Sequence, residues 1–325
     1  MVSAVEWDAV LAKLYAAQGV VLTTHQNPDG DGIGSILALW HHLRQSGVDV
    51  YAHCIDPVPR IYRFLDGADQ ISSGSFTQSG VDTIVCLDCG AAGRLAQDES
   101  FFANRTLINI DHHKSNRRFG SINIVDSSYS ATGVMMVDLI KVDGVELTRS
   151  MAEAVYVTII TDTGSFRHRG VDGALHRLTA DLIDAGVDPE EVGQRVYSCN
   201  SHARMKLMSL ALDSLYFSHH DQVAWLHVTD ESYRESGADV EDTEGLIDIA
   251  ASVDGVEVAI FLRPNDSGAG WKVSFRSRGR VEVGDLAGRL GGGGHPNAAG
   301  CLVAGDMESV RTQVHKQVSV ALDGL

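Results

Sequence analysis

The 325-residue sequence has no apolar run of the ~20 residues that a membrane-spanning helix needs. Its first eight residues also lack the basic start and the apolar stretch of a signal peptide. Cysteine is scarce, and the five cysteines are odd in number and scattered, unlike the disulfide framework of a small secreted domain. These absences predict a cytoplasmic protein with reduced cysteines and no membrane partner. For the C-x-x-C pair Cys86 and Cys89, a core role is favoured over a redox or zinc site.

Positive charge is also in short supply. The chain has 26 lysines and arginines against 43 acids, which gives a formal net charge of −17. Such a chain repels a polyanion, so long nucleic acid is not an expected partner. Short phosphorylated molecules remain compatible, because bound cations and a few arginines suffice to hold one or two phosphates. The apolar content of 44% is ordinary for a folded protein and argues against disorder or a fibrous fold.

The first half of the chain alternates predicted strands and helices. Apolar runs typical of buried strands lie at residues 19–24, 48–54, 83–87 and 106–110. Helical patterns lie at residues 33–45, 131–140, 151–161 and 172–184. This alternation predicts an α/β domain in which helices cover both faces of a parallel sheet.

The second half has a different character. Alternating strand patterns lie at residues 222–228, 256–262 and 271–276, and helical patterns at 242–251 and 283–290. They predict a smaller, mixed α/β domain. A polar segment with a proline separates the two halves, so we expect a first domain over residues 1–188, a linker over 189–205 and a second domain over 206–325.

Acids and histidines follow four predicted elements of the first domain. In chain order they are His25, Asp29, Asp31, Asp88, Asp111, His112, His113 and Asp162. In an open α/β sheet, ligands bind at the edge where strands end, so we expect these side chains to meet there. Any one of them taken alone is equally well a turn former or a helix cap. Four such coincidences in one domain favour a functional site.

Imidazole and carboxylate donors without cysteine suit manganese, cobalt, iron or zinc better than magnesium or calcium. We therefore expect two Mn²⁺ ions, with Co²⁺, Mg²⁺ or Zn²⁺ as substitutes. Two ions that lie ~3.5–4 Å apart and share a carboxylate stabilise both the attacking and the leaving oxygen in phosphoryl transfer. The pattern thus predicts a two-metal phosphoesterase.

In order and context, these residues resemble the four motifs of the DHH phosphoesterase superfamily, which is named for its third motif, Asp111-His112-His113. The run from Gly291 to His295, followed by Ala298-Ala299-Gly300, resembles the glycine-rich signature of the DHH-associated C-terminal domain. The likeness covers essentially the whole chain. Length and domain plan resemble the nanoRNase and pAp-phosphatase group.

The resemblance implies roles for the site residues. One manganese would be held by His25, Asp29 and Asp88, and the other by Asp31, Asp88, His112 and Asp162, so that Asp88 bridges the ions. His113 would contact the scissile phosphate, and Asp111 would orient the histidines. Asp88, Asp111 and His113 are therefore the expected catalytic residues.

In similar proteins the second domain binds the nucleotide and the active site lies in the cleft between the domains. The expected substrate-binding residues are His113, Arg276, Ser277, Gly292, Gly293, Gly294 and His295. Consecutive glycines let backbone N–H groups face an anion, although a tight bend without a ligand is the alternative. Ser130 and Thr132 are interpreted as helix caps. Histidines outside the motifs are interpreted as exposed or structural: His41, His42, His219 and His220.

The leading hypothesis is a manganese-dependent phosphodiesterase and phosphatase. It would cleave short oligoribonucleotides and dinucleotides to mononucleotides and dephosphorylate pAp to AMP; pApA, pGpG and cyclic di-AMP are candidate substrates that the sequence does not rank. An inorganic pyrophosphatase or short-chain exopolyphosphatase is the alternative, and a non-catalytic nucleotide-sensing protein is an alternative of another class. The oligomeric state is left open, a homodimer included.

Overall fold

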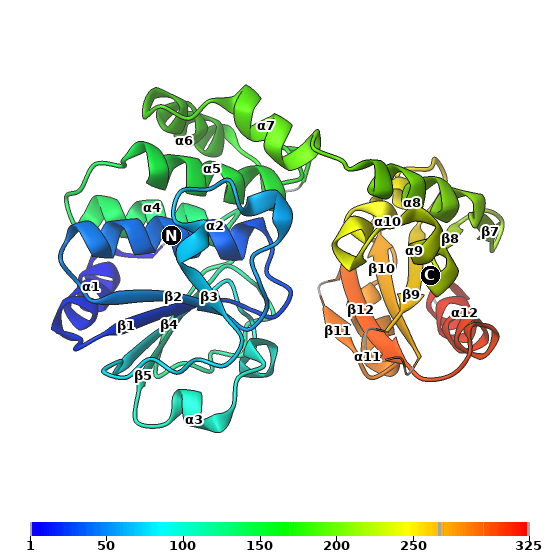
Figure 1. The fold of residues 1–325 in the computed structure, drawn as a ribbon, viewed down its shortest axis with the longest axis horizontal. Helices are drawn as coiled ribbons and strands as arrows, with labels where there is room; N and C mark the ends of the chain where they lie inside the picture. The colour runs from blue at the N-terminus through cyan, green and yellow to red at the C-terminus, as the bar shows by residue number, and fades with distance from the viewer. Residues whose placement is uncertain (1, 169, 266–267, 269, 295, 324–325) are drawn as a thin grey trace. The chain divides into compact units, whose positions relative to one another are not determined.

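The computed structural model describes residues 2–168, 170–265, 268, 270–294 and 296–323. The chain divides into two compact units, Met1–Cys199 and Asn200–Leu325, which are described separately (Figure 1). The segment predicted as a linker contains helix α7 (Pro189–Tyr197) and the start of α8 (His202–Asp213). No helix in the described ranges is long and apolar enough to cross a membrane.

The first unit contains a six-stranded parallel sheet, as predicted. Its strands are β1 (Val20–Thr23), β2 (Val50–Cys54), β3 (Ile71–Ser73), β4 (Thr83–Leu87), β5 (Thr106–Asp111) and β6 (Ile122–Val125). They lie in the order β3-β2-β1-β4-β5-β6, and every neighbouring pair is parallel. After β1 the chain adds β2 and then β3 on one side of the sheet. It then returns to form β4 on the other side of β1 and adds β5 and β6 beyond it. Between β1 and β4 the crossovers diverge, which leaves room for a ligand at the carboxyl edge.

Helices cover this sheet on both faces. The helices of this unit that precede α7 are α1 (Ala4–Ala16), α2 (Gly30–Gln45), α3 (Glu99–Phe102), α4 (Thr132–Val142), α5 (Arg149–Asp162) and α6 (Gly173–Asp184), with 3₁₀ turns η1 (Arg60–Tyr62), η2 (Ala68–Gln70) and η3 (Ala92–Leu95). Side chains alternate along a strand, so Leu22 and Leu87 enter the large core with α2, whereas Val21 and Ile84 pack against Phe101 of α3.

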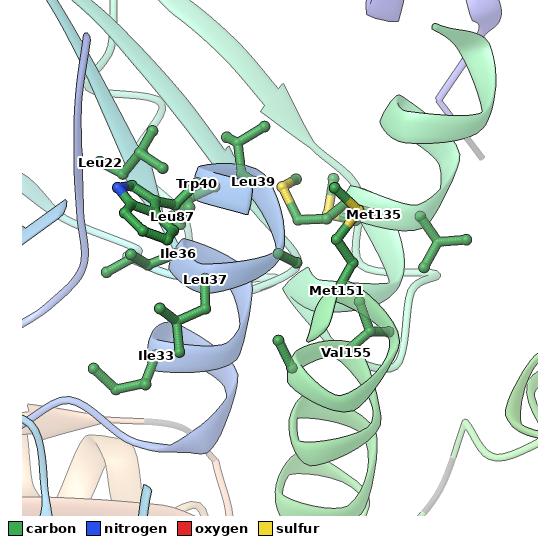
Figure 2. Close-up of a cluster of buried hydrophobic side chains, with 14 of the residues drawn as sticks. Leu22, Ile33, Ile36, Leu37, Leu39, Trp40, Leu87, Met135, Met151 and Val155 are labelled. Carbon is green, nitrogen blue, oxygen red and sulfur yellow. The ribbon is translucent and has the colours of Figure 1, made fainter. Parts of the chain in front are cut away.

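Helix α2 is central to this core. Figure 2 shows Ile36 and Trp40 of α2 beside the strand residues Leu22 and Leu87, with Met135 of α4 and Val155 of α5 in the same cluster. Most residues of α2 are buried, as expected for a helix that is apolar around most of its circumference.

The helices α2, α4 and α5 approach one another closely at two glycines. A Cβ atom at Gly34 of α2 or at Gly133 of α4 would overlap the side chain of Thr158 on α5. Because no side chain intervenes, the start of α2, the start of α4 and the end of α5 can meet beside the sheet. Those three ends carry Asp31, Thr132 and Asp162.

The second unit contains a mixed six-stranded sheet, which confirms the predicted mixed α/β class. Its strands are β7 (Tyr216–Ser218), β8 (Val223–His227), β9 (Val258–Pro264), β10 (Trp271–Ser277), β11 (Gly293–Gly294) and β12 (Ala298–Val303), in the order β11-β12-β10-β9-β8-β7. All neighbouring pairs are antiparallel except β8 with β9.

The helices of the second unit cover two faces of its sheet. They are α8, α9 (Asp230–Ser236), α10 (Leu246–Ala251), α11 (Val283–Arg289) and α12 (Met307–Asp323). One core contains α11 and α12, and the other contains α8 and α10. The helix predicted at residues 242–251 is wrong in its first part. A 3₁₀ turn, η4 (Val240–Thr243), precedes Gly245, whose φ of 75° separates this turn from α10.

Candidate metal centre

All eight acids and histidines predicted for the first domain meet at the carboxyl edge of the parallel sheet. His25 follows β1, Asp88 follows β4, and Asp111 is the last residue of β5. These three strands are neighbours at the centre of the sheet. Helices supply most of the other acids: α2 carries Asp31 in its first turn, and α5 ends at Asp162.

The helix that carries Asp31 begins earlier than predicted. Asp29 is its N-cap, and its Oδ1 accepts the backbone N–H groups of Asp31 and Gly32, both at 3.1 Å. The helix therefore starts at Gly30 rather than at Ile33. Asp29 is thus a helix cap, and its other oxygen, Oδ2, lies 3.6 Å from Nε2 of His25.

Donor atoms gather in three overlapping groups, and within each group they lie within 4.8 Å of one another. The groups are His25, Asp29 and Asp88; Asp31, His112 and Asp162; and Asp88, His112 and His113. Asp88 links them, since its Oδ2 is 3.6 Å from Nε2 of His25 and its Oδ1 is 3.7 Å from Nε2 of His112. One carboxylate thus faces two groups through different oxygens.

His25 and His112 are both oriented as metal ligands. Their Nδ1 atoms lie 2.8 Å from the carbonyl oxygen of Gln26 and 3.2 Å from that of Tyr129, respectively. A carbonyl only accepts, so each Nδ1 carries a proton, and Nε2, which faces the carboxylates, is the ring atom left to bind a metal ion. Nε2 of His112 is buried without a hydrogen-bond partner among the described residues. The site therefore fits a metal ion.

His113 is held differently. Its Nδ1 lies 2.6 Å from Oδ1 of Asp111 and 3.3 Å from Oδ1 of Asp88. Burial alone would lower the pKa of His113, but the hydrogen bond to Asp111 and the charge of Asp88 raise it to about 9. Asp111 faces the histidine ring, and the three groups of ligand atoms do not include it.

The carboxylates repel one another in this buried place. Burial, and then the negative charge of Asp88, raises the pKa of Asp31 far above its ordinary value. Burial and Asp88 likewise raise the pKa of Asp162 to about 7, although His112 opposes this. The pKa of Asp88 stays low despite burial, because His25 and His113 stabilise its charge. A divalent cation would relieve the repulsion, and the mixed donor set suits manganese, iron, cobalt or zinc.

Thr132 is a site residue that the sequence reasoning missed. Its hydroxyl donates to Oδ1 of Asp88 at 3.3 Å, and its N–H donates to Oδ2 of Asp31 at 2.7 Å. The N–H of Gly133 donates to the other oxygen of Asp31 at 3.0 Å. The interpretation of Ser130 and Thr132 as caps is wrong, since Ala131 is the N-cap of α4 and the first N–H groups of the helix bond the carboxylate of Asp31. A small polar residue at a helix start is the only local signal, because its partners lie far away in the chain.

In the second unit, two of the predicted substrate-binding residues are already bonded within the protein. Nε of Arg276 donates to Oδ1 of Asp248 at 3.0 Å. The hydroxyl of Ser277 donates to Oε1 of Glu257 at 3.2 Å and accepts the N–H of Gly279 at 3.0 Å. Ser277 therefore shapes the turn after β10.

Two residues of the glycine run, Gly293 and Gly294, form the short strand β11. Gly293 and Gly294 pair with Gly300 and Ala299 of β12. A Cβ atom at Gly292 would overlap the β12 backbone, so close packing of the chain explains the glycine there. His295 lies outside the described residues.

The cysteine pair and the histidines of α2 belong to none of these ligand groups. Cys86 and Cys89 are buried and reduced, and Sγ of Cys89 donates to the carbonyl of Ala91 at 3.2 Å. His42 is buried in α2 beside Asp143, and His41 bonds the carbonyl of Asp66. These positions agree with the core and structural interpretations.

A parallel sheet with a buried cluster of acids and histidines at its carboxyl edge is the architecture of a metal-dependent enzyme. Residues 19–183 match the DHH family, N-terminal domain, and residues 221–319 match the DHHA1 domain. The chain belongs to the DHH family, which confirms the predicted resemblance.

Relatives of known name cover almost the whole chain. The bifunctional oligoribonuclease and PAP phosphatase NrnA of Thermus thermophilus is 36% identical over 309 residues, which are 94% of this chain and 91% of that protein. The protein of the same name from Bacillus subtilis is 25% identical over 287 residues, 87% of this chain and 89% of that one. An exopolyphosphatase-related protein from Bacteroides fragilis has a crystal structure with a TM-score of 0.89, 26% identity and coverage of 98% and 96%.

Proposed function

We propose that the protein is a manganese-dependent phosphodiesterase and phosphatase. It cleaves short oligoribonucleotides and dinucleotides such as pApA and pGpG to mononucleotides, with cyclic di-AMP as a further candidate, and it removes the 3′-phosphate of pAp to give AMP. The observation that carries this proposal is Asp88, whose two oxygens face different groups of ligand atoms. The name of the Thermus thermophilus relative supports the substrate class.

The proposal assigns two Mn²⁺ ions to these groups. His25, Asp29 and Asp88 hold one ion, and Asp31, Asp88, His112 and Asp162 hold the other. When bound, such ions neutralise charge on a phosphate and lower the pKa of water. Co²⁺, Mg²⁺ or Zn²⁺ substitute for Mn²⁺ where the ligand geometry allows.

The protein's own groups orient the substrate and the ligands. His113 has Nδ1 committed to Asp111, so Nε2 is the atom that contacts the scissile phosphate. Two N–H groups at the start of α4 fix the carboxylate of Asp31. In the second unit, the nucleotide is bound by Arg276, Ser277, Gly292, Gly293, Gly294 and His295. A net charge of −17 favours short substrates over long nucleic acid.

The first test is to incubate the purified protein with Mn²⁺ and, separately, pApA, pAp and pyrophosphate, and to resolve the products by ion-exchange chromatography. We expect AMP from both nucleotides and no phosphate from pyrophosphate. Asp88→Asn keeps the side-chain shape and should abolish turnover. Asp66 is an exposed carboxylate that accepts a hydrogen bond from Ser150, and the control Asp66→Asn should retain turnover.

Other outcomes would overturn the proposal. Phosphate released from pyrophosphate alone would favour the alternative of a pyrophosphatase or short-chain exopolyphosphatase, and the Bacteroides fragilis protein is named as exopolyphosphatase-related. Tight Mn²⁺-dependent binding of nucleotides without turnover of any substrate would favour a nucleotide-sensing protein.

A further inference from the structure

The segment that follows the site histidines is anchored through Asn116. The backbone N–H of Asn116 donates to the carbonyl of His113 at 3.1 Å, which turns the chain back toward the sheet. The N–H of Arg117 donates to the carbonyl of Gly90 at 2.9 Å, and that of Arg118 donates to Oδ1 of Asn116 at 2.6 Å. The hydrogen bond from Arg118 therefore fixes the side-chain oxygen of Asn116.

The amide nitrogen of Asn116 faces only acceptors. Nδ2 lies 2.5 Å from Oδ2 of Asp111, 2.8 Å from Oδ1 of Asn109 and 3.1 Å from the carbonyl oxygen of Cys89. Reversing the amide would place its oxygen against three oxygens and its nitrogen against the N–H of Arg118. The surroundings therefore permit only one orientation, with the nitrogen toward Asp111.

Asp111 is held at both oxygens as a result. Its Oδ2 accepts from Asn116, and its Oδ1 bonds Nδ1 of His113 at 2.6 Å. Asp111 is fully buried, so no solvent competes for either oxygen. A carboxylate bonded at Oδ2 cannot rotate freely, and Oδ1 stays directed at the histidine ring.

We propose that Asn116 is a positioning residue for the phosphoesterase reaction: it holds Asp111, which in turn holds the ring of His113 toward the substrate. The inference rests on the proposed function and adds to it a residue outside the groups that hold metal. Asn116 suits this place because an amide donates a hydrogen bond without adding charge. An aspartate there would bring a further carboxylate against Asp111.

The direct test is Asn116→Leu, which keeps the size and removes the donor. We expect kcat for pAp to fall ~10- to 100-fold, the range for residues that orient a site group, while KM and the Mn²⁺ affinity from calorimetry change less than ~3-fold. Asn123→Leu is the matched control. Within the described part of the chain its amide bonds only Gly120, at 2.6 and 3.0 Å, so the kcat of this variant should match that of the wild type. Asn116→Ser, which also loses the amide donor, serves if the leucine variant does not fold.

A double mutant separates positioning from general damage. In a His113→Ala background, Asn116→Leu should lower kcat by less than ~3-fold, because the ring that it positions is gone. An equal loss in both backgrounds would overturn the inference, as would a wild-type kcat in Asn116→Leu or a lost Mn²⁺ affinity.

A spectroscopic measurement tests the inference without turnover. In metal-free protein labelled with ¹⁵N-histidine, the Nδ1–H of His113 should give a downfield proton signal, assigned by its absence in His113→Ala. We expect this signal to shift or broaden in Asn116→Leu and to persist in Asn123→Leu. An unchanged signal in Asn116→Leu would contradict the inference. A wild type that cleaves no nucleotide would refute the proposed function alone.

Discussion

The hydroxyl of Thr132 donates to Oδ1 of Asp88, the same oxygen that lies 3.7 Å from Nε2 of His112. The backbone N–H of Thr132 bonds Asp31 at 2.7 Å. One residue at the start of α4 therefore orients two carboxylates that come from separate parts of the chain.

Replacing Thr132 by valine should weaken metal binding. The change keeps the shape and the backbone bond to Asp31 but removes the hydroxyl, so we expect a ~10-fold lower Mn²⁺ affinity by calorimetry, as for other residues that orient ligands. Thr132→Ser should retain wild-type affinity. Thr158→Val is the control, because the buried Thr158 hydroxyl bonds only the α5 backbone, at Val155. Equal affinity in the wild type and Thr132→Val would show that the hydroxyl does not contribute.

The number of bound ions should depend on which ligand residue is replaced. His25 belongs to one group of ligand atoms, whereas Asp88 belongs to two. We expect His25→Ala to bind one Mn²⁺ fewer than the wild type and Asp88→Asn to lose high-affinity binding of both ions. Equilibrium dialysis with metal analysis measures this. A full complement of ions in Asp88→Asn would contradict the shared carboxylate.

Gly133→Ala should destabilise the protein, although alanine is the better helix former. A Cβ atom at this position overlaps Thr158, so we expect the free energy of unfolding to fall by roughly 1–3 kcal/mol. Thr158→Ala removes the two nearest overlapping atoms, Oγ1 and Cγ2, and should restore part of that loss in the double mutant. Urea denaturation measures both. Alanine is favoured over glycine in a helix by about 1 kcal/mol. If Gly133→Ala stabilised the protein by that amount, the helices would separate easily enough to admit the Cβ atom.

Acid should destabilise the protein partly through His42. Burial lowers the pKa of this histidine, although Asp143 opposes the shift with its Oδ2 at 3.1 Å from Nε2. The unfolded chain binds a proton near the ordinary pKa of about 6.5, while the folded chain stays neutral to lower pH. His42 therefore contributes to the stability of the folded state at pH values above the pKa of the unfolded chain. This contribution is lost as the pH falls through the folded-state pKa.

The difference between two proteins isolates this contribution. Urea denaturation at about pH 7.5 and about pH 5.5 should show a larger loss of stability in the wild type than in His42→Gln. A larger loss of stability in His42→Gln than in the wild type would mean that folding raises the pKa of His42 rather than lowering it.

The centre of the first unit could be predicted because its signals are local. A strand buried in a parallel sheet is a continuous apolar run, as in residues 83–87, and the acid after it marks the carboxyl edge. Parallel pairing then places His25, Asp88 and Asp111 together, since β1, β4 and β5 are neighbours.

The features that the sequence did not reveal depend on contacts between distant segments. The edge strands β3 and β6 are short and partly exposed, so they lack a strong apolar pattern. The N–H groups at Thr132 meet Asp31, which lies about a hundred residues earlier. The glycines of β11 look like an anion-binding loop in the sequence, because a residue pattern does not show that another strand packs against them.

The donor atoms of the metal centre come from segments that are far apart in the sequence, between His25 and Asp162. An ion bound there would act as a cross-link that joins β1, α2, β4, β5 and α5 in the folded state alone. By mass action, an ion at 100 times its dissociation constant adds about 2.7 kcal/mol to the stability of the folded form. The second unit has hydrophobic cores of its own, and none of the residues described for it belongs to the three groups. Chelation should therefore lower the melting temperature of the first unit and leave that of the second unchanged, so that one calorimetric transition would divide into two.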